Sequence, residues 1–193
     1  MNDIVKSGLR FLLAFMLLYS ILTAISLAPP VASACNALYR KASQPVIQVL
    51  LPKAYMHFKE GKASAGIIRV EYISKAKLDK KMNQQRRPGT EKVSVTGFDY
   101  EIFFYRIFLS LFVFFLTLML LSPIRRKEKL IGVFIGGLVL FVFSLIKIYL
   151  LLMVVFNDTQ VAVYQSSEGT MSFVSGVLSV FTLSISLLIV LVL

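Results

Sequence analysis

Four long runs of apolar residues, separated by polar segments, dominate the pattern of the chain and predict four transmembrane helices. They cover residues 11–31, 101–122, 130–156 and 171–193. Each run has roughly the 20 apolar residues that a helix needs to cross a bilayer, and the third is long enough to be tilted. Pro29-Pro30 and Ser122-Pro123 end the first two runs, because proline interrupts a helix.

Residues 32–100, between the first two runs, predict a small extracytoplasmic region. Residues 36–58 mix apolar and polar positions as in a helix that lies on the membrane surface, broken at its two prolines. Residues 67–73 and 92–98 alternate apolar and polar side chains, which is typical of half-buried strands. We expect these strands to pair as a β-hairpin. Since two strands alone are marginally stable, the membrane, the interfacial helix or a partner must cover their apolar face.

A strongly basic stretch, residues 75–90, joins the two expected strands. Its polar composition and the closing Pro88-Gly89 predict a mobile loop. Its basic residues are Lys75, Lys77, Lys80, Lys81, Arg86 and Arg87. They could bind anionic envelope material, and the simpler alternative is a solvated loop.

The short connections predict the orientation of the chain. Residues 123–129 carry four Lys/Arg, whereas residues 157–170 carry none, so the first connection is expected inside and the second outside. Residues 1–10 and the end of the last helix are then cytoplasmic. The region 32–100 is net basic, but it exceeds the loop length over which this rule holds.

The first apolar run has an alternative interpretation as a secretory signal. Ala32-Ser33-Ala34 precedes Cys35 and has the small-residue pattern that a signal peptidase accepts, so cleavage after Ala34 competes with a retained helix. The run is longer than the apolar core of a typical signal, which favours the retained helix.

Composition supports a membrane protein. Hydrophobic residues make up 57% of the 193 positions and charged residues 16%, which is more apolar than a typical soluble domain. The 21 Lys/Arg against 10 Asp/Glu flank the apolar runs, where membrane topology explains them better than nucleic acid does. A single cysteine and a single histidine are too few for a Cys/His metal cage. We therefore expect no nucleic acid, metal or cofactor.

The residue patterns of standard catalysis are missing from the sequence, so we expect no enzymatic activity. It has no Gly-rich phosphate loop, HExxH helix, GxSxG elbow or paired CxxC. Cys35 could act as a nucleophile only with His57 as its base. An interfacial position beside Tyr55 and Phe58 explains His57 more simply.

Four charged residues are candidates for an intramembrane or interfacial site. They are Lys147, Arg106, Asp99 and Glu101. Lys147 is the one ionisable group well inside a predicted span, which makes it a functional candidate with Asp99 or Glu101 as counter-ion. Arg106 competes for the same carboxylates. The alternative is that the long Lys147 side chain reaches the headgroups.

Small residues on the last two predicted spans are candidates for helix packing or partner contact. They are Gly132, Gly136, Gly137, Ser172, Ser175, Gly176, Ser179, Thr182 and Ser186. Their spacing of three and four places them along one face of each helix, where another helix can approach closely. That helix can belong to this chain or to a partner.

The order of these features carries a family resemblance. An aromatic span ends at Leu121-Ser122-Pro123 before Arg125-Arg126, and a glycine-containing span begins Leu130-Ile131-Gly132, after a first span, prolines and two short strands. This layout resembles the small membrane proteins encoded with exosortases. The resemblance implies an accessory of a bacterial system that handles proteins with a C-terminal sorting signal, and it implies no catalytic role for Cys35 or Arg106.

Together these features predict a non-catalytic accessory or scaffold protein of an envelope protein-sorting or assembly system. We expect a multi-pass protein of the bacterial inner membrane, whose partners are the lipid bilayer and another membrane protein such as an exosortase-type enzyme. One alternative is a small transporter or membrane enzyme that uses Lys147. A second is a binder of anionic envelope material through the basic loop. The oligomeric state stays open.

Overall fold

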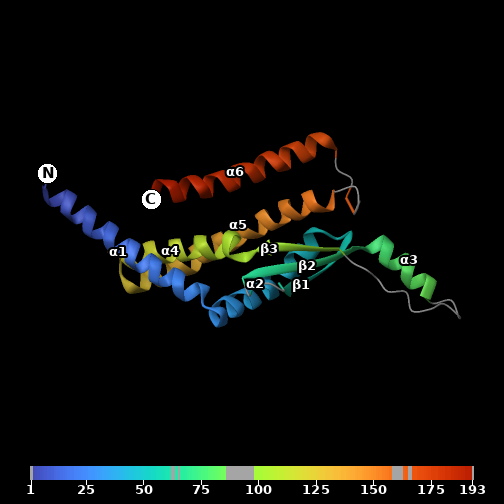
Figure 1. Ribbon diagram of the computed structural model, residues 1–193, viewed down its shortest axis with the longest axis horizontal. Coiled ribbons are helices and arrows are strands. Elements are labelled where there is room, and N and C mark those ends of the chain that lie inside the picture. Colours follow the sequence, from blue (N-terminus) through green and yellow to red (C-terminus); the bar gives the residue numbers. More distant parts are fainter. Residues whose placement is uncertain are drawn as a thin grey trace. The chain divides into compact units, whose positions relative to one another are not determined.

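The structure, a computed structural model, is mostly helical with one small sheet (Figure 1). It describes residues 2–61, 64, 66–85, 98–157, 163–164 and 167–192, and only the backbone of 2–5, 81–85 and 181–192. The elements are α1 (Asn2–Leu27), α2 (Pro29–Leu50), β1 (Ala54–Glu60), β2 (Ile67–Ser74), α3 (Lys75–Gln85), β3 (Phe98–Phe103), the π-helix η1 (Tyr105–Leu109), α4 (Ser110–Leu121), α5 (Arg126–Phe156) and α6 (Glu168–Val192).

Two helices in the described part of the chain are long and apolar enough to cross a membrane. They are the Lys6–Leu27 part of α1 and all of α5. The apolar helix Tyr105–Leu121 is shorter. Four such helices were expected, and the structure supports the coarser statement of two membrane-length helices and a small sheet.

The chain folds into two compact units. The first comprises Met1–Arg40, Glu60–Ile68 and Glu101–Ser144, and the second comprises Lys41–Lys59, Arg69–Tyr100 and Leu145–Leu193. Helices α2 and α5 and all three strands contribute residues to both units.

Aromatic contacts hold α1 and α4 together in the first unit. The ring of Phe114 on α4 lies edge-on to Phe15 and Tyr19 of α1, with centroids 5.4 and 6.2 Å apart. Phe15 is accordingly buried, although most apolar side chains of α1 are exposed. Edge-to-face rings add specific geometry to apolar burial, so this pair fixes where α1 meets α4.

A buried hydrogen bond joins α2 to α5 in the same unit. The Tyr39 hydroxyl lies 2.7 Å from Ser144 Oγ, which itself donates to the Phe141 carbonyl. Because Ser144 has one hydroxyl hydrogen, Tyr39 is the donor between the two. The Tyr39 ring packs among Phe104, Phe108 and Phe141. Burial among these groups raises the pKa of Tyr39 to about 12.

In the second unit the last turns of α5 pack against the sheet. The rings of Tyr72 on β2 and Phe156 on α5 are 4.7 Å apart. Ile148, Leu152 and Phe156 are fully buried. This apolar core explains why a helix of 31 residues ends where it does. Its final turns belong to the core of this unit.

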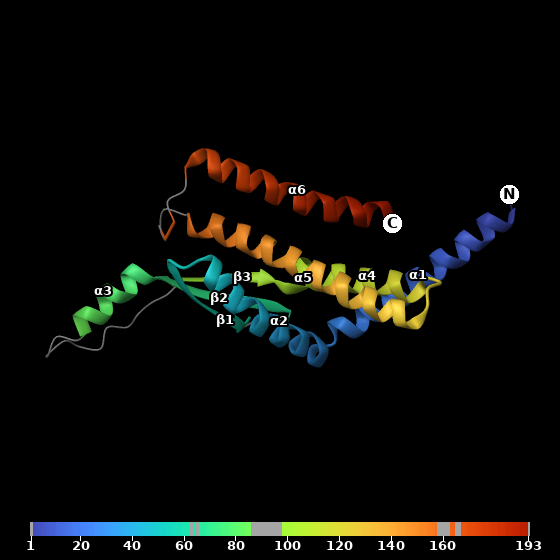
Figure 2. The same cartoon turned by 180° about the vertical axis from the view of Figure 1, so that it is seen from behind.

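The sheet has the order β1-β2-β3 (Figure 2). The Gly61 amide bonds to the Ile67 carbonyl, and the Lys75 amide bonds to the Lys53 carbonyl, which makes β1 and β2 antiparallel. The Phe104 amide bonds to the Gly66 carbonyl and sets the register of β3 against β2. Ala54, Met56 and Phe58 of β1 are buried while the residues between them are exposed, so one face of this strand is apolar.

Several local expectations are wrong. Residues 54–60 form strand β1, although the predicted surface helix extends to residue 58. The alternation of buried and exposed side chains along 54–58 is the pattern of a strand. Helix α2 continues through Pro45, where a break was expected, because contacts on both sides of the proline hold it. The Pro29-Pro30 pair starts α2, since prolines in a first helical turn need no amide hydrogen.

The segments around β3 also differ from expectation. Residues 75–85 form helix α3 instead of a loop, in keeping with their many good helix formers. Besides β1, the strand that pairs with β2 is β3 (Phe98–Phe103), so the predicted helix over 101–122 begins as strand and continues as η1 and α4. Of the strand expected at 92–98, residues 92–97 lie outside the described part. The strand expected at 67–73 is confirmed as β2.

Candidate functional site

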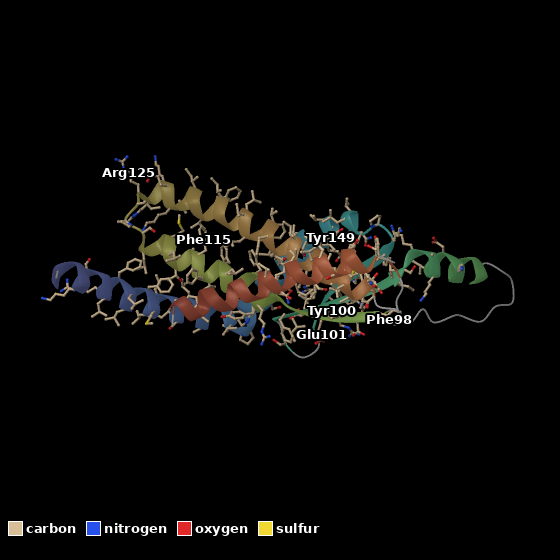
Figure 3. The ribbon with its side chains drawn as sticks, turned by 90° about the horizontal axis from the view of Figure 1, so that it is seen from above. Phe98, Tyr100, Glu101, Phe115, Arg125 and Tyr149 are labelled. Carbon is tan, nitrogen blue, oxygen red and sulfur yellow. The ribbon has the colours of Figure 1, made fainter. Side chains whose placement is uncertain are left out.

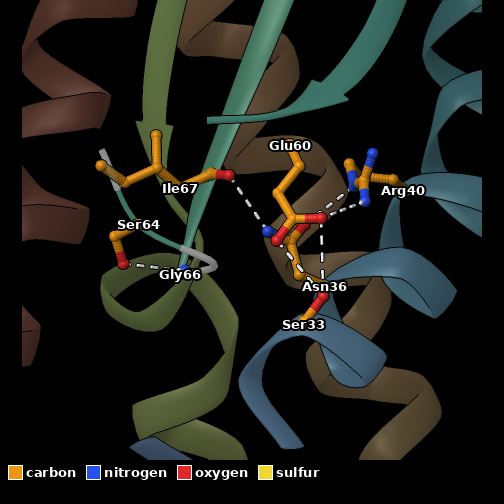
Figure 4. A network of polar contacts seen from close by, with 7 residues as sticks. All are labelled: Ser33, Asn36, Arg40, Glu60, Ser64, Gly66 and Ile67. Carbon is orange, nitrogen blue, oxygen red and sulfur yellow. Dashed lines mark hydrogen bonds and ion pairs between the residues drawn. The ribbon is translucent and has the colours of Figure 1, made fainter. Parts of the chain in front are cut away.

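Polar side chains on one face of α2 hold the hairpin formed by β1 and β2. In the first unit Asn36, which is fully buried, donates to the Ile67 carbonyl at 3.0 Å, and its own oxygen accepts from Arg40 Nε at 3.2 Å (Figure 4). Glu60, at the end of β1, accepts from Ser33 Oγ at 3.2 Å and lies 3.5 Å from Arg40. These contacts come from helical positions three and four residues apart, which share one face of a helix.

In the second unit two glutamines of α2 cover the outer edge of β1. Gln48 accepts from the Met56 amide at 3.0 Å and donates to the Ala54 carbonyl at 2.7 Å. Gln44 accepts from the Phe58 amide at 3.2 Å. Each side-chain amide thus replaces a neighbouring strand, and the edge of β1 offers no free pairing site at these atoms.

In the second unit, the face of the sheet opposite the buried side chains of β1 carries a row of alternating charges. Lys59 Nζ lies 2.6 Å from Glu71, and Arg69 Nε lies 3.8 Å from Glu71 and 2.9 Å from Asp99. The hydrogen bond from Lys59 holds the pKa of Glu71 below its usual value. Because these side chains are partly exposed, each pair contributes little to stability but keeps this face polar.

The outer edge of β3 differs from that of β1. Phe104 bonds to β2 through its backbone, and residues of a strand alternate in direction. Asp99, Glu101 and Phe103 therefore direct their amides and carbonyls away from β2. No described strand pairs with this edge. Figure 3 labels Glu101, whose side chain is exposed.

The charged candidates do not form the expected pairs. Lys147 is 9% exposed in the second unit, and no ion pair links it to a carboxylate in the described part of the chain. Asp99 pairs with Arg69 instead, so the expectation that it neutralises Lys147 is wrong. Glu101 forms no ion pair with any described residue. The guanidinium of Arg106 lies 5.3 Å from the ring centre of Phe103.

The glycines of α5 contact the same chain. A side chain at Gly132 would meet Met119, one at Gly136 would meet Phe115, and one at Gly137 would touch Phe112 at 3.3 Å. These three partners lie on α4, so the glycine patch closes a helix pair within the first unit.

The hydroxyl-rich face of α6 is open along its described side chains. Ser172, Ser175, Gly176 and Ser179 are exposed, and nothing lies within 4 Å of a Cβ placed at Gly176. The side chains of Thr182 and Ser186 lie outside the described residues. Contact of this seam with a helix of this chain or of a partner stays a prediction.

The remaining candidates are Cys35, His57 and the basic residues of the stretch 75–90. Cys35 is a free, half-buried thiol, and His57 Nδ1 lies 3.5 Å from Gln44 Nε2. Lys75, Lys77 and Lys80 are exposed on α3, with Lys77 Nζ 6.0 Å from the Phe98 ring centre. The side chains of Lys81, Arg86 and Arg87 are outside the described part. Within the described residues no group of three potential metal ligands occurs.

Sequence reasoning missed the residues that build this region. Asn36, Arg40, Gln44 and Gln48 repeat every four positions along α2, which is a signal of one polar helical face. The mixed pattern of residues 36–58 predicts only a helix on the membrane surface. The burial of Asn36 and the edge of β1 could not be read from that spacing, because both depend on a strand that was not recognised.

Comparison with known proteins identifies no relative. No protein-family model, curated protein or solved structure matches the chain. Function is therefore inferred from the residues themselves.

Proposed function

We propose that this chain is a membrane-embedded, non-catalytic accessory or scaffold protein. The observation that carries the proposal is a large exposed apolar surface on two helices of membrane length. On α1 it comprises Leu9, Phe11, Leu12, Leu13, Met16, Leu17, Ile21, Ile25 and Leu27. On α5 it comprises Leu130, Ile131, Phe134, Ile135, Leu138, Val139 and Val142.

Among the described residues nothing covers this surface. Leu17 is 65% exposed and Phe134 is 75% exposed. Contiguous apolar patches of this kind are rare on soluble monomers and are typical of membrane or partner contact. The residues on α5 recur at spacings of one and three, so they form one continuous helical face that suits a lipid bilayer.

The polar residues support a structural role. Asn36, Gln44 and Gln48 bond to strand backbone, and Arg40 and Glu60 pair with each other. A catalytic group would instead have to leave part of its bonding capacity for a substrate. A folded platform beside a membrane anchor is what a scaffold protein requires.

The setting we propose is an exosortase-type protein-sorting system of the bacterial inner membrane, on the basis of the sequence layout. By the positive-inside rule, the basic residues around the start of α5 favour a cytoplasmic location for that end of the helix. The partner would be another membrane protein of that system.

Membrane residence is tested by extracting membranes with alkaline carbonate. A chain anchored by α1 and α5 stays in the pellet, whereas a peripheral protein is released. Replacing Phe134 and Leu138 by Asp should release the chain or prevent its accumulation, and replacing the exposed Lys41 and Lys53 by Asp serves as the matched control.

The scaffold role is tested by affinity capture of the tagged full-length chain from native membranes in mild detergent. A membrane protein recovered in near-equal amount supports the role. A chain that purifies alone contradicts it and favours the transport alternative, in which Lys147→Met abolishes activity.

A second candidate function is binding of anionic envelope material by α3. It is favoured by the exposure of Lys75, Lys77 and Lys80 on one short helix. Replacing the three lysines by Gln should weaken binding to anionic vesicles, and the wild-type binding should fall with salt.

A further inference from the structure

The two outer edges of the sheet are treated differently. The edge of β1 is closed by Gln44 and Gln48, whereas the edge of β3 has no partner strand in the described part of the chain. An exposed edge presents amides and carbonyls that can pair with another chain, and natural proteins usually protect it. Because the edge of β1 is closed and the edge of β3 is open, the edge of β3 is a candidate binding site for another strand.

The exposed side chains of β3 specify the edge further. The Glu101 carbonyl and the Phe103 amide both point away from β2, next to each other in the arrangement that Gln48 satisfies at the edge of β1. Glu101 is exposed and forms no described ion pair, and Phe103 is 51% exposed. The edge therefore combines backbone pairing groups with the free Glu101 carboxylate and an apolar ring, and the exposed Arg106 guanidinium lies 5.3 Å from the centre of that ring.

A second copy of this chain is a poor occupant of the edge. Antiparallel pairing of β3 with itself would place Glu101 opposite or next to Glu101 or Asp99 of the other copy. Like charges facing each other across strands destabilise the pair. A strand that carries Lys or Arg opposite Glu101 gains from the same geometry.

We propose that the outer edge of β3 binds an extended, basic segment of a partner protein, which adds as a fourth strand to the sheet. Backbone hydrogen bonds at Glu101 and Phe103 supply the pairing, and the Glu101 carboxylate selects for a basic residue. The proposal rests on the proposed function in one respect, that a partner protein exists.

The test uses full-length protein in an uncharged detergent and a labelled peptide, Thr-Lys-Val-Lys-Val-Lys-Thr, followed by fluorescence anisotropy. Two matched peptides serve as controls. One replaces each Lys by Glu, and the other keeps every side chain but carries N-methyl groups on alternate amides, which removes donors along one edge. We expect the basic peptide to bind and each control to bind at least about tenfold more weakly.

Two protein variants locate the site. Glu101→Lys should weaken the basic peptide about fivefold, and Glu128→Lys, an exposed carboxylate at the start of α5, should leave it unchanged. Phe103→Pro removes an amide that does not face β2, so the sheet should persist by circular dichroism while peptide binding is lost.

Several results would overturn strand addition. Equal binding of the N-methylated peptide would show a purely electrostatic contact, and no binding of any peptide would exclude the site. Dimers cross-linked through position 103 would identify a second copy as the occupant. Binding that appears only after residues 86–97 are removed would assign the edge to the chain's own segment.

Two outcomes distinguish a failure of strand addition at β3 from a failure of the scaffold role. If a membrane protein still co-purifies in near-equal amount with the Phe103→Pro variant, the scaffold role stands and strand addition is wrong. If nothing co-purifies with the wild-type chain but the basic peptide binds as expected, the edge is confirmed as a peptide site and the scaffold role is wrong.

Discussion

Helix α5 has two halves of similar composition and different surroundings. Its first half, in the first unit, exposes a continuous apolar face that includes Phe134 and Leu138, and it contacts α4 through glycines. Its second half, in the second unit, buries Ile148, Leu152 and Phe156 completely. One unbroken apolar helix thus leaves an apolar face exposed at one end and fills a protein core at the other.

The same distinction explains the length of the helix. A bilayer core is about 30 Å thick, whereas 31 helical residues extend about 46 Å. The excess matches the half that packs against the sheet through Phe156 and Tyr72. The apolar composition of α5 indicates that its side chains are buried. It does not say whether protein or lipid surrounds them, because both favour the same residue types.

The sharpest test of the comparison is a matched pair of leucines. Leu152→Ala should lower the free energy of unfolding by about 3–5 kcal/mol, because the side chain is fully buried and leaves a cavity. Leu138→Ala, at a position that is 55% exposed, should change it by less than about 0.5 kcal/mol. Denaturation followed by circular dichroism in detergent measures both. Equal losses would mean that the two halves do not differ.

A charge tests whether the exposed face enters lipid. Leu138→Asp should raise the apparent free energy of membrane insertion of α5 by about 3 kcal/mol, since a carboxylate near the middle of a span is costly. Leu130→Asp, at the exposed beginning of the helix, should cost much less. A glycosylation reporter fused to the segment gives both values. Insertion that ignores position 138 would remove the first half from the membrane.

A larger side chain at Gly136 tests the contact between α4 and α5. Gly136→Leu should destabilise the folded chain by about 1–3 kcal/mol, because the new side chain meets the Phe115 ring. The control is Gly176→Leu on α6, where a Cβ meets no neighbour. Thermal unfolding in detergent compares them. A stable Gly136→Leu variant would show that α4 and α5 are not packed through this position.

The smallest expected effect concerns the hydrogen bond between Tyr39 of α2 and Ser144 of α5. Tyr39→Phe should cost about 1 kcal/mol at neutral pH, because one buried hydrogen bond to Ser144 is lost.

The pH dependence of Tyr39 has a defined sign. Because burial raises its pKa to about 12 from an ordinary value of 10.0, the folded state favours the neutral phenol. That stabilisation is complete below pH 10 and disappears as the pH rises from about 10 to 12. The wild type should lose stability over this window relative to Tyr39→Phe. If the free energy of unfolding changed with pH in the same way for both proteins, a buried, protonated Tyr39 would be contradicted.

Local pattern predicted those elements whose cause is local. Alternation at 67–73 corresponds to β2, and the apolar run at 130–156 corresponds to most of α5. The glycines at 132 and 136 were correctly identified as packing residues, but their partner was unknown because spacing does not say which helix approaches. The prediction that Asp99 pairs with Lys147 is wrong, because Asp99 pairs with Arg69, which is distant from it in the sequence.

The sequence by itself determined that the chain carries long apolar helices, a basic start to α5, and a polar stretch with at least one strand. These follow from hydropathy and periodicity, which are properties of neighbouring residues. Only the tertiary structure decided that α2 continues through Pro45, that Gln44 and Gln48 close one sheet edge while β3 leaves the other open, and that half of α5 is core. Each of these depends on residues distant in sequence meeting in space, and apolar composition alone cannot distinguish lipid from protein as the surrounding medium.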